Sequence, residues 1–221
     1  MVGVWERQTA HPQVIVGIPF SPVTPLTTDW IIGLMNLQLP PYTRVQWQKG
    51  VPIDVSRNTL VRSAQEHKAN YIFFLDSDVI PPPDIVQVLM AWKLPIISGV
   101  YWSKKGYPAV WETHPSGKGF TPIKNLPKRG LTEVAATSMG CSLIDMRVFS
   151  CMPDPWFEWG LRDPRKEGEG GGHSEDLTFC ARATQHGFKL FVDPELRCLH
   201  ETVLEVDVEG GTRFGTVQKE A

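Results

Sequence analysis

The chain has 221 residues, of which 42% are hydrophobic and 21% are charged, an ordinary composition for a soluble globular protein. The formal net charge is −2, which gives no reason to expect a general attraction to nucleic acid. No apolar run approaches the roughly 20 residues that a membrane-spanning helix needs, and residues 1–7 lack a signal-peptide pattern. We therefore expect a cytoplasmic protein with no transmembrane segment and no nucleic-acid partner.

The first part of the sequence alternates between buried strands and amphipathic helices. Apolar runs bounded by proline, glycine or polar residues predict strands at 14–18, 43–47, 71–75 and 96–101. Capping residues, prolines and helical spacing predict helices after Thr28-Asp29, over 54–68 and after the prolines 81–83. Strand and helix in alternation indicate an α/β fold, built on a parallel sheet with helices on both faces.

The sequence changes character after Tyr101. Residues 102–136 are rich in turn residues, and short strands are predicted at 109–112 and 132–136. Residues 151–172 combine proline, tryptophan and glycine and predict a long mobile loop. Beyond this loop the pattern predicts one helix and three strands, at 175–186, 189–192, 196–200 and 203–208.

Asp76 and Asp78 form the strongest chemical signal, because the apolar strand 71–75 runs directly into them. They are expected at the carboxyl end of a buried strand, where open α/β sheets bind ligands. Carboxylate oxygens suit Mg²⁺ or Mn²⁺, and such a metal usually carries phosphate oxygens from a substrate. The pair predicts a metal-dependent site for a phosphorylated ligand such as a nucleotide, and the alternative is simple capping of the next helix.

Glu175 and Asp176 follow a glycine-rich stretch, 170–172, that is typical of a lid hinge. A carboxylate under a lid can act as a general base or bind an acceptor hydroxyl. The alternative is that both residues only complement the dipole of the helix that begins there.

Two further sites carry polar groups at the ends of predicted elements. Arg57 and Asn58 lie near a helix start, where their donors could meet a nucleotide base or a phosphate, unless they form a solvated first turn. His200 ends an apolar strand and could complete an octahedral metal site beside the aspartates, although such histidines are often structural.

The order of these motifs resembles the GT-A glycosyltransferases, close to the family 2-like members and to short versions in phage and microbial genomes. The similarity covers roughly residues 12–200 and rests on Ile18-Pro19, 54–58, 74–78 followed by prolines, 174–180 and His200. It implies a Rossmann-like nucleotide-binding sheet with a smaller acceptor-binding part, within a single domain, 1–221. The implied divisions are a nucleotide-sugar-binding half, an acceptor-binding and catalytic half, and a C-terminal extension, at 12–101, 102–200 and 201–221.

The resemblance also implies a reaction, the transfer of a sugar from a UDP- or GDP-linked donor to an acceptor hydroxyl on a glycan or another molecule. Asp78 and His200 would hold the divalent cation, Mn²⁺ or Mg²⁺, and Asp76 would contact the ribose or the metal and its water shell. Pro19, Asp54 and Arg57 match positions around the base and ribose.

Glu175 or Asp176 matches the catalytic base of inverting members of this fold. The two adjacent carboxylates favour inversion, while a retaining reaction and the oligomeric state, including a homo-oligomer, stay open. Four tryptophans offer flat surfaces for stacking on the acceptor sugar, with core packing as the alternative: Trp102, Trp111, Trp156 and Trp159.

Two other functions fit parts of the pattern. A haloacid-dehalogenase-like, Mg²⁺-dependent phosphohydrolase also has an apolar strand ending in Asp-x-Asp, with the first Asp as nucleophile. The prolines at 81–83 and the late position of the strand disfavour this alternative. The other is a non-catalytic module that binds a nucleotide sugar or a glycan.

Overall fold

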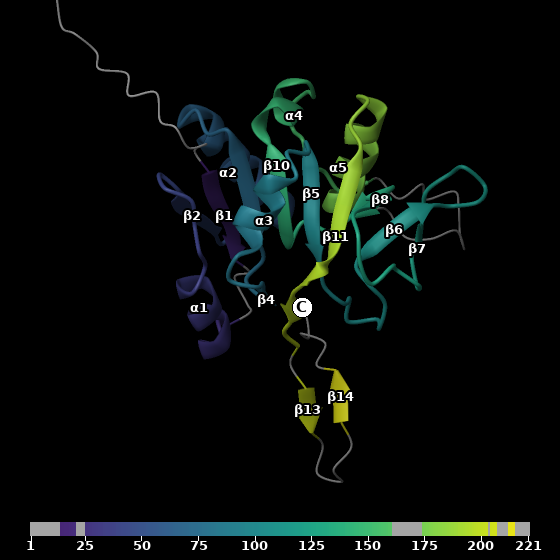
Figure 1. Ribbon diagram of the computed structural model, residues 1–221, viewed down its shortest axis with the longest axis horizontal. Coiled ribbons are helices and arrows are strands. Elements are labelled where there is room, and N and C mark those ends of the chain that lie inside the picture. The colour runs from purple at the N-terminus through teal and green to yellow at the C-terminus, as the bar shows by residue number, and fades with distance from the viewer. Residues whose placement is uncertain (1–13, 21–24, 161–173, 203, 207–211, 215–221) are drawn as a thin grey trace, which may run out of the picture.

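The computed structural model describes residues 14–20, 25–160, 174–202, 204–206 and 212–214. A seven-stranded sheet with the order β2-β1-β3-β10-β5-β11-β8 forms its centre (Figure 1). In chain order these strands are β1 (Val14–Phe20), β2 (Arg44–Lys49), β3 (Tyr71–Leu75), β5 (Ile96–Val100), β8 (Thr132–Val134), β10 (Cys141–Asp145) and β11 (Leu190–Arg197).

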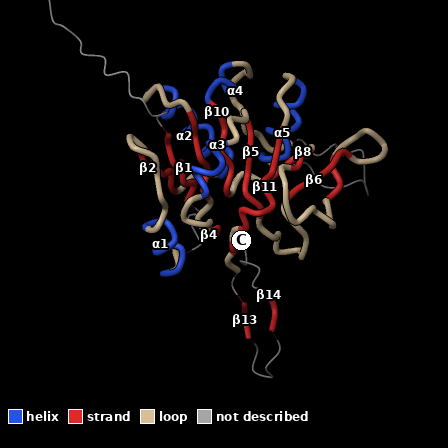
Figure 2. The backbone as a smooth tube through the Cα atoms, in the orientation of Figure 1, coloured by secondary structure: helices blue, strands red, loops and turns tan. Residues whose placement is uncertain are grey.

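Helices cover both faces of this sheet, as the alternating pattern predicts (Figure 2). One face packs against α2 (Ile53–Glu66), α4 (Met146–Ser150) and α5 (Glu175–Gln185), and the other against α1 (Thr28–Met35) and α3 (Ile85–Ala91). Successive β3 side chains serve the two faces in turn, so Phe74 joins the first core and Phe73 the second. A strand that is buried on both faces must be apolar throughout, which explains the run before the aspartates.

The four strands of residues 14–101 run in one direction, as predicted, although the complete sheet is mixed. β1 pairs in parallel with β2 and β3, but β10 lies between β3 and β5 and runs antiparallel to both. β11 is parallel to β5, and β8 is antiparallel to β11. Strands from both predicted halves of the chain therefore share one sheet.

Smaller sheets surround the central one. β4 (Val79–Ile80) pairs with β12 (Leu199–His200), directly beyond the ends of β3 and β11. A second small sheet has the order β7 (Phe120–Pro122), β6 (Val110–Thr113) and β9 (Ala136–Thr137). β13 (Leu204–Val206) and β14 (Thr212–Phe214) form a pair that lies away from the body of the molecule (Figure 1).

Some predicted segments fall partly beyond what the structure covers. Residues 151–160 contain neither helix nor strand, while the rest of the predicted loop, including the glycines 170–172, lies outside the described residues. The tail strand predicted at 203–208 is described only at 204–206. Among the residues with described positions, no helix has the length and apolar character that crossing a membrane requires.

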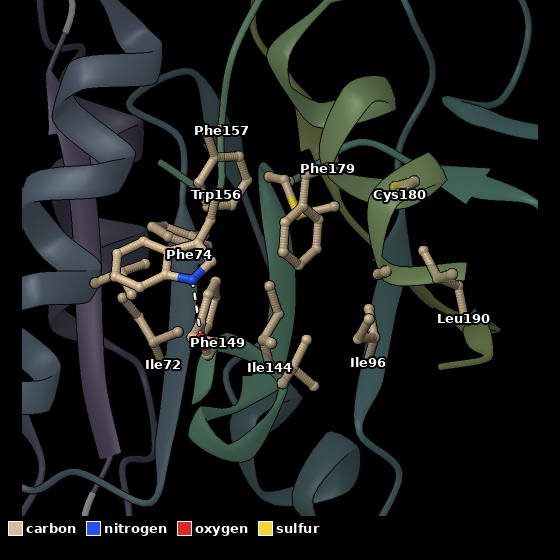
Figure 3. Packing of buried hydrophobic residues seen from close by; sticks show 14 of the residues in the cluster. Ile72, Phe74, Ile96, Ile144, Phe149, Trp156, Phe157, Phe179, Cys180 and Leu190 are labelled. Carbon is tan, nitrogen blue, oxygen red and sulfur yellow. Dashed lines mark hydrogen bonds between the residues drawn. The ribbon is translucent and has the colours of Figure 1, made fainter. Parts of the chain in front are cut away.

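An aromatic cluster joins the end of β3 to the helix α5 (Figure 3). The Phe157 ring stacks on the Phe179 ring of α5 at 4.6 Å, and its edge meets Phe74 of β3 at 5.5 Å. Trp156 is buried, and its Nε1 donates to the Phe149 carbonyl at 2.9 Å, so packing explains this tryptophan and sugar stacking does not. The cluster fixes where α5 begins relative to the end of β3.

Candidate active site

The carboxyl ends of β1, β2, β3, β5 and β11 meet at one edge of the sheet, because all five strands run in the same direction. Open α/β sheets bind ligands at this edge. A cleft of about 520 Å³ opens there. It is lined by Pro19, Phe20, Gly50, Val51, Pro52, Ile53, Ser56, Asp76, Ser77 and Asp78.

Asp78 and His200 meet at this edge although 122 residues separate them in the chain. Pairing of β4 with β12 sets Val79 opposite His200, and His200 Nε2 lies 3.3 Å from Asp78 Oδ2. His200 Nδ1 lies 2.7 Å from the Trp102 carbonyl oxygen, which can only accept, so the proton of the neutral ring is on Nδ1. In the neutral ring Nε2 therefore carries the lone pair that a metal would bind, whereas in the protonated ring Nε2–H donates to Asp78.

Lys104 completes the surroundings of Asp78. Its Nζ lies 3.1 Å from Asp78 Oδ2, the same oxygen that His200 contacts. Burial alone would raise the pKa of Asp78, but the hydrogen bond from His200 and the charge of Lys104 bring the pKa below its ordinary value. Burial acts to lower the pKa of His200, and the hydrogen bonds to Asp78 and the Trp102 carbonyl raise it overall.

The donor set fits a cation that is shared with a substrate. Within the described parts of the chain, no group of three or more His, Cys, Asp or Glu side chains could enclose a metal ion. Asp78 and His200 offer one oxygen and one nitrogen ligand. Mg²⁺ in nucleotide sites is typically held by one or two carboxylates, with phosphate oxygens and water at its other positions. These two residues therefore suit a metal that binds together with a diphosphate.

Asp76 has a different environment, although only Ser77 separates it from Asp78. Both of its carboxylate oxygens accept from Arg57 Nη2, at 3.0 and 3.2 Å. Its backbone N–H donates to the Gly140 carbonyl at 3.0 Å, and its carbonyl accepts from Trp30 Nε1 at 2.9 Å. Asp76 lines the cleft, but its carboxylate is engaged by Arg57 and not by the Asp78–His200 pair.

Arg57 is the centre of a buried ionic bridge. Its side chain is 2% exposed, and its Nε donates to Glu175 Oε1 at 3.2 Å while Nη2 serves Asp76. The guanidinium also lies over the Phe74 ring, 5.2 Å from its centre. Burial tends to lower the pKa of Arg57, and the two carboxylates outweigh it and raise the pKa, so the group stays charged. Arg57 thus ties α2, β3 and α5 together, and it does not line the cleft.

Asn58 and Asp54 also lie outside the cleft lining. Asn58 Oδ1 accepts from the backbone N–H groups of Trp156 and Phe157, both at 3.0 Å, and its Nδ2 donates to the Phe157 carbonyl at 2.8 Å. This geometry gives Asn58 a structural role. Asp54 lies in the first turn of α2, and its Oδ1 is buried with no hydrogen-bond partner among the described residues.

The two carboxylates at the start of α5 are not equivalent. Glu175 is 4% exposed and bound to Arg57; burial raises its pKa, and Arg57 opposes that rise. Asp176 is half-buried, and its Oδ1 accepts from the Leu177 N–H at 2.8 Å and from the Ser174 hydroxyl. Asp176 is therefore the more accessible of the two candidate bases.

The sequence interpretation missed the wall of the cleft formed by the turn from β2 to α2, Gly50 to Ile53, and by Ser56. One signal was available, because β2 runs in the same direction as β3 and the turn after it therefore lies at the same edge of the sheet as Asp76. Trp102 and Trp159 are more than half exposed, and Trp102 lies beside the Asp78–His200 pair through its carbonyl.

Among the comparisons with known proteins, only those with solved structures found matches, and these support the architecture. No protein-family model matches the chain, and no curated protein matches it in sequence. Among solved structures, A197 from STIV superposes with a TM-score of 0.61 at 16% identity, covering 96% of this chain and 97% of that one. GalNAc-T7, solved with UDP, GalNAc and Mn²⁺, superposes with a TM-score of 0.51 at 17% identity, over 87% of this chain and 44% of that one. The predicted fold class is confirmed: the mixed α/β sheet with helices on both faces matches the GT-A glycosyltransferase fold.

Proposed function

We propose that this protein is a metal-dependent glycosyltransferase of the hexosyltransferase type, which moves a sugar from a UDP- or GDP-linked donor to an acceptor hydroxyl. The observation that carries the proposal is the approach of His200 Nε2 to Asp78 Oδ2, at 3.3 Å, beside a cleft at the carboxyl edge of the sheet. GalNAc-T7, which shares the fold, was solved with ligands of this class, UDP, GalNAc and Mn²⁺.

The cleft offers a suitable place for the donor nucleotide. Pro19, Phe20 and Pro52 provide apolar walls for a base, while Ser56 and Asp76 provide polar groups for a ribose. Arg57, predicted as a direct contact, would act by holding Asp76 in place, since its Nε and Nη2 are paired within the protein.

Asp78 and His200 would hold the divalent cation, which supplies positive charge to the leaving diphosphate. The Trp102 carbonyl keeps the His200 proton on Nδ1, so Nε2 is available as a ligand. In an inverting reaction Asp176 would take the proton from the acceptor hydroxyl. Glu175 would fix Arg57 and the start of α5, because its carboxylate is already engaged.

The phosphohydrolase alternative needs Asp76 as a free nucleophile. Both Asp76 oxygens accept from one arginine nitrogen, Arg57 Nη2, and this ion pair holds the carboxylate that would have to attack the phosphate. The binding-module alternative is separated by Asp176→Asn. A transferase loses sugar transfer while keeping nucleotide affinity, whereas a binding module has no transfer to lose.

Calorimetric titration with UDP and with GDP, each with and without Mn²⁺, tests the proposal. We expect one nucleotide to bind, and to bind only with the metal. Asp78→Ala should weaken this binding at least about tenfold, since loss of even an outer-shell partner commonly costs that much. Asp84→Ala removes an equal, exposed charge just beyond β4 and serves as the control. Absence of metal-dependent binding, or equal affinities for the two variants, would overturn the proposal.

A further inference from the structure

A short hairpin, residues 101–109, contacts the Asp78–His200 pair. The Ala109 N–H donates to the Tyr101 carbonyl at 2.9 Å, and the Ser103 N–H donates to the Tyr107 carbonyl at 2.8 Å. Gly106 closes the turn with a φ of +84°, a conformation that costs glycine little. The backbone of the hairpin is therefore held at both its base and its tip.

Three groups of this hairpin touch the pair. The Tyr101 ring meets the His200 ring edge-on at 4.9 Å, and the Trp102 carbonyl accepts from His200 Nδ1. Both contacts come from a buried ring or from backbone, so they are fixed. The third contact, Lys104 Nζ to Asp78 Oδ2 at 3.1 Å, comes from a flexible side chain that is 51% exposed.

Lys104 therefore forms an ion pair with the same Asp78 carboxylate that a bound cation would need. A divalent ion bound at Asp78 Oδ2 would place two positive centres on one oxygen, and their repulsion would drive the ammonium away. Lysine binds phosphate as a mobile point charge, and a diphosphate held next to Asp78 would lie within reach of the displaced side chain.

We propose that Lys104 neutralises Asp78 while no divalent cation is bound, and that it exchanges this carboxylate for the donor's diphosphate when the cation arrives. The proposal rests on the proposed function. It assigns Lys104 two opposite effects: competition with the metal in the absence of nucleotide, and support for the diphosphate in its presence.

The test compares Lys104→Ala with Lys105→Ala, which removes an equal, exposed charge one position further along the same hairpin. Free Mn²⁺ is first followed by electron paramagnetic resonance without nucleotide. Lys104→Ala should bind Mn²⁺ about two- to fivefold more tightly, the range expected for removing a partly exposed ion pair. Lys105→Ala should change this affinity by no more than about twofold, because salt screens exposed charges.

Binding of UDP and GDP is then measured by calorimetry at saturating Mn²⁺. For whichever nucleotide binds, Lys104→Ala should weaken the affinity about tenfold, as expected for the loss of a charged hydrogen bond. Lys105→Ala should leave this affinity unchanged. Equal Mn²⁺ affinity in Lys104→Ala and the unaltered protein would overturn the exchange, as would equal tightening in both variants or unchanged nucleotide affinity in Lys104→Ala. If the unaltered protein binds neither nucleotide with Mn²⁺, the proposed function itself fails; if it binds and only the Lys104 effects are missing, the exchange alone fails.

Discussion

Asp76 and Asp78 differ more in their surroundings than their spacing suggests. Asp76 is paired with an arginine that is 2% exposed, and that arginine is anchored in turn by Glu175 of α5. Asp78 is paired with a lysine that is 51% exposed and with a histidine. A buried network whose members depend on one another fixes geometry, whereas an exposed pair can exchange partners at little cost. The surroundings of the first aspartate hold it in place, whereas those of the second leave it able to change partners.

The largest expected effect concerns Arg57. Arg57→Met should lower the free energy of unfolding by about 3–5 kcal/mol, because it leaves Asp76 and Glu175 buried without a counter-charge. Arg62→Met is the matched control, since Arg62 lies on the same helix and pairs with Asp154 at the surface; its loss should cost at most about 1 kcal/mol. Urea denaturation measures the free energy of unfolding of both variants. Similar losses in the two would contradict the distinction between a buried and an exposed ion pair.

Asn58→Ala tests whether this residue supports the fold and not the nucleotide. The change leaves the N–H groups of Trp156 and Phe157 buried without an acceptor, so we expect a loss of about 2–4 kcal/mol in the free energy of unfolding. Nucleotide affinity of the folded variant should be retained. A stable variant with weakened nucleotide binding would instead show that Asn58 contacts the nucleotide, as the sequence analysis predicted.

Gly140→Ala probes how tightly Asp76 is enclosed. An added Cβ would lie 2.6 Å from Tyr101 Oη and 3.0 Å from Asp76 Oδ2, so we expect a loss of about 1–3 kcal/mol from overpacking. Adding Tyr101→Phe removes the closest atom and should recover part of this loss in thermal unfolding. If Gly140→Ala does not change the free energy of unfolding, the residues packed around Asp76 can shift to make room for the added methyl group.

The smallest expected effect is on the Asp78 side. Lys104→Ala should change the free energy of unfolding by less than about 1 kcal/mol, because the pair is partly exposed. Denaturation carried out alongside Arg57→Met gives the comparison directly. A cost of several kcal/mol would show that Lys104 is a fixed part of the fold and is not available for exchange.

Much of the fold could be predicted from local pattern. The sequence located β1, β3, α2 and α5 to within a few residues, because the two strands are apolar runs bounded by turn residues and the two helices are long enough to show helical spacing. The place of β10 could not be predicted, since a short apolar run does not reveal whether it pairs in parallel or between two earlier strands. The two-residue strand β4 is too short to leave a pattern, and although β12 lies within the strand predicted at 196–200, nothing local indicates the pairing that brings His200 to Asp78.

The candidate site was predicted as a group of residues but not as a set of pairs. Nothing local indicates that Arg57 meets Glu175, which lies 118 residues away. One signal was available, because Arg57 shares the helical spacing of Leu60, Val61 and Ala64, the buried stripe of α2. An arginine on such a stripe is expected to pair inside the protein and not with a ligand.

The central claim is that Asp78 and His200 share one divalent cation when a nucleoside diphosphate is bound. Pulsed electron paramagnetic resonance of bound Mn²⁺, with UDP or GDP present, detects directly whether a histidine nitrogen coordinates the ion. We predict a nitrogen coupling in the unaltered protein that disappears in His200→Ala. Bound Mn²⁺ with no nitrogen coupling, or with a coupling that survives His200→Ala, would contradict the account.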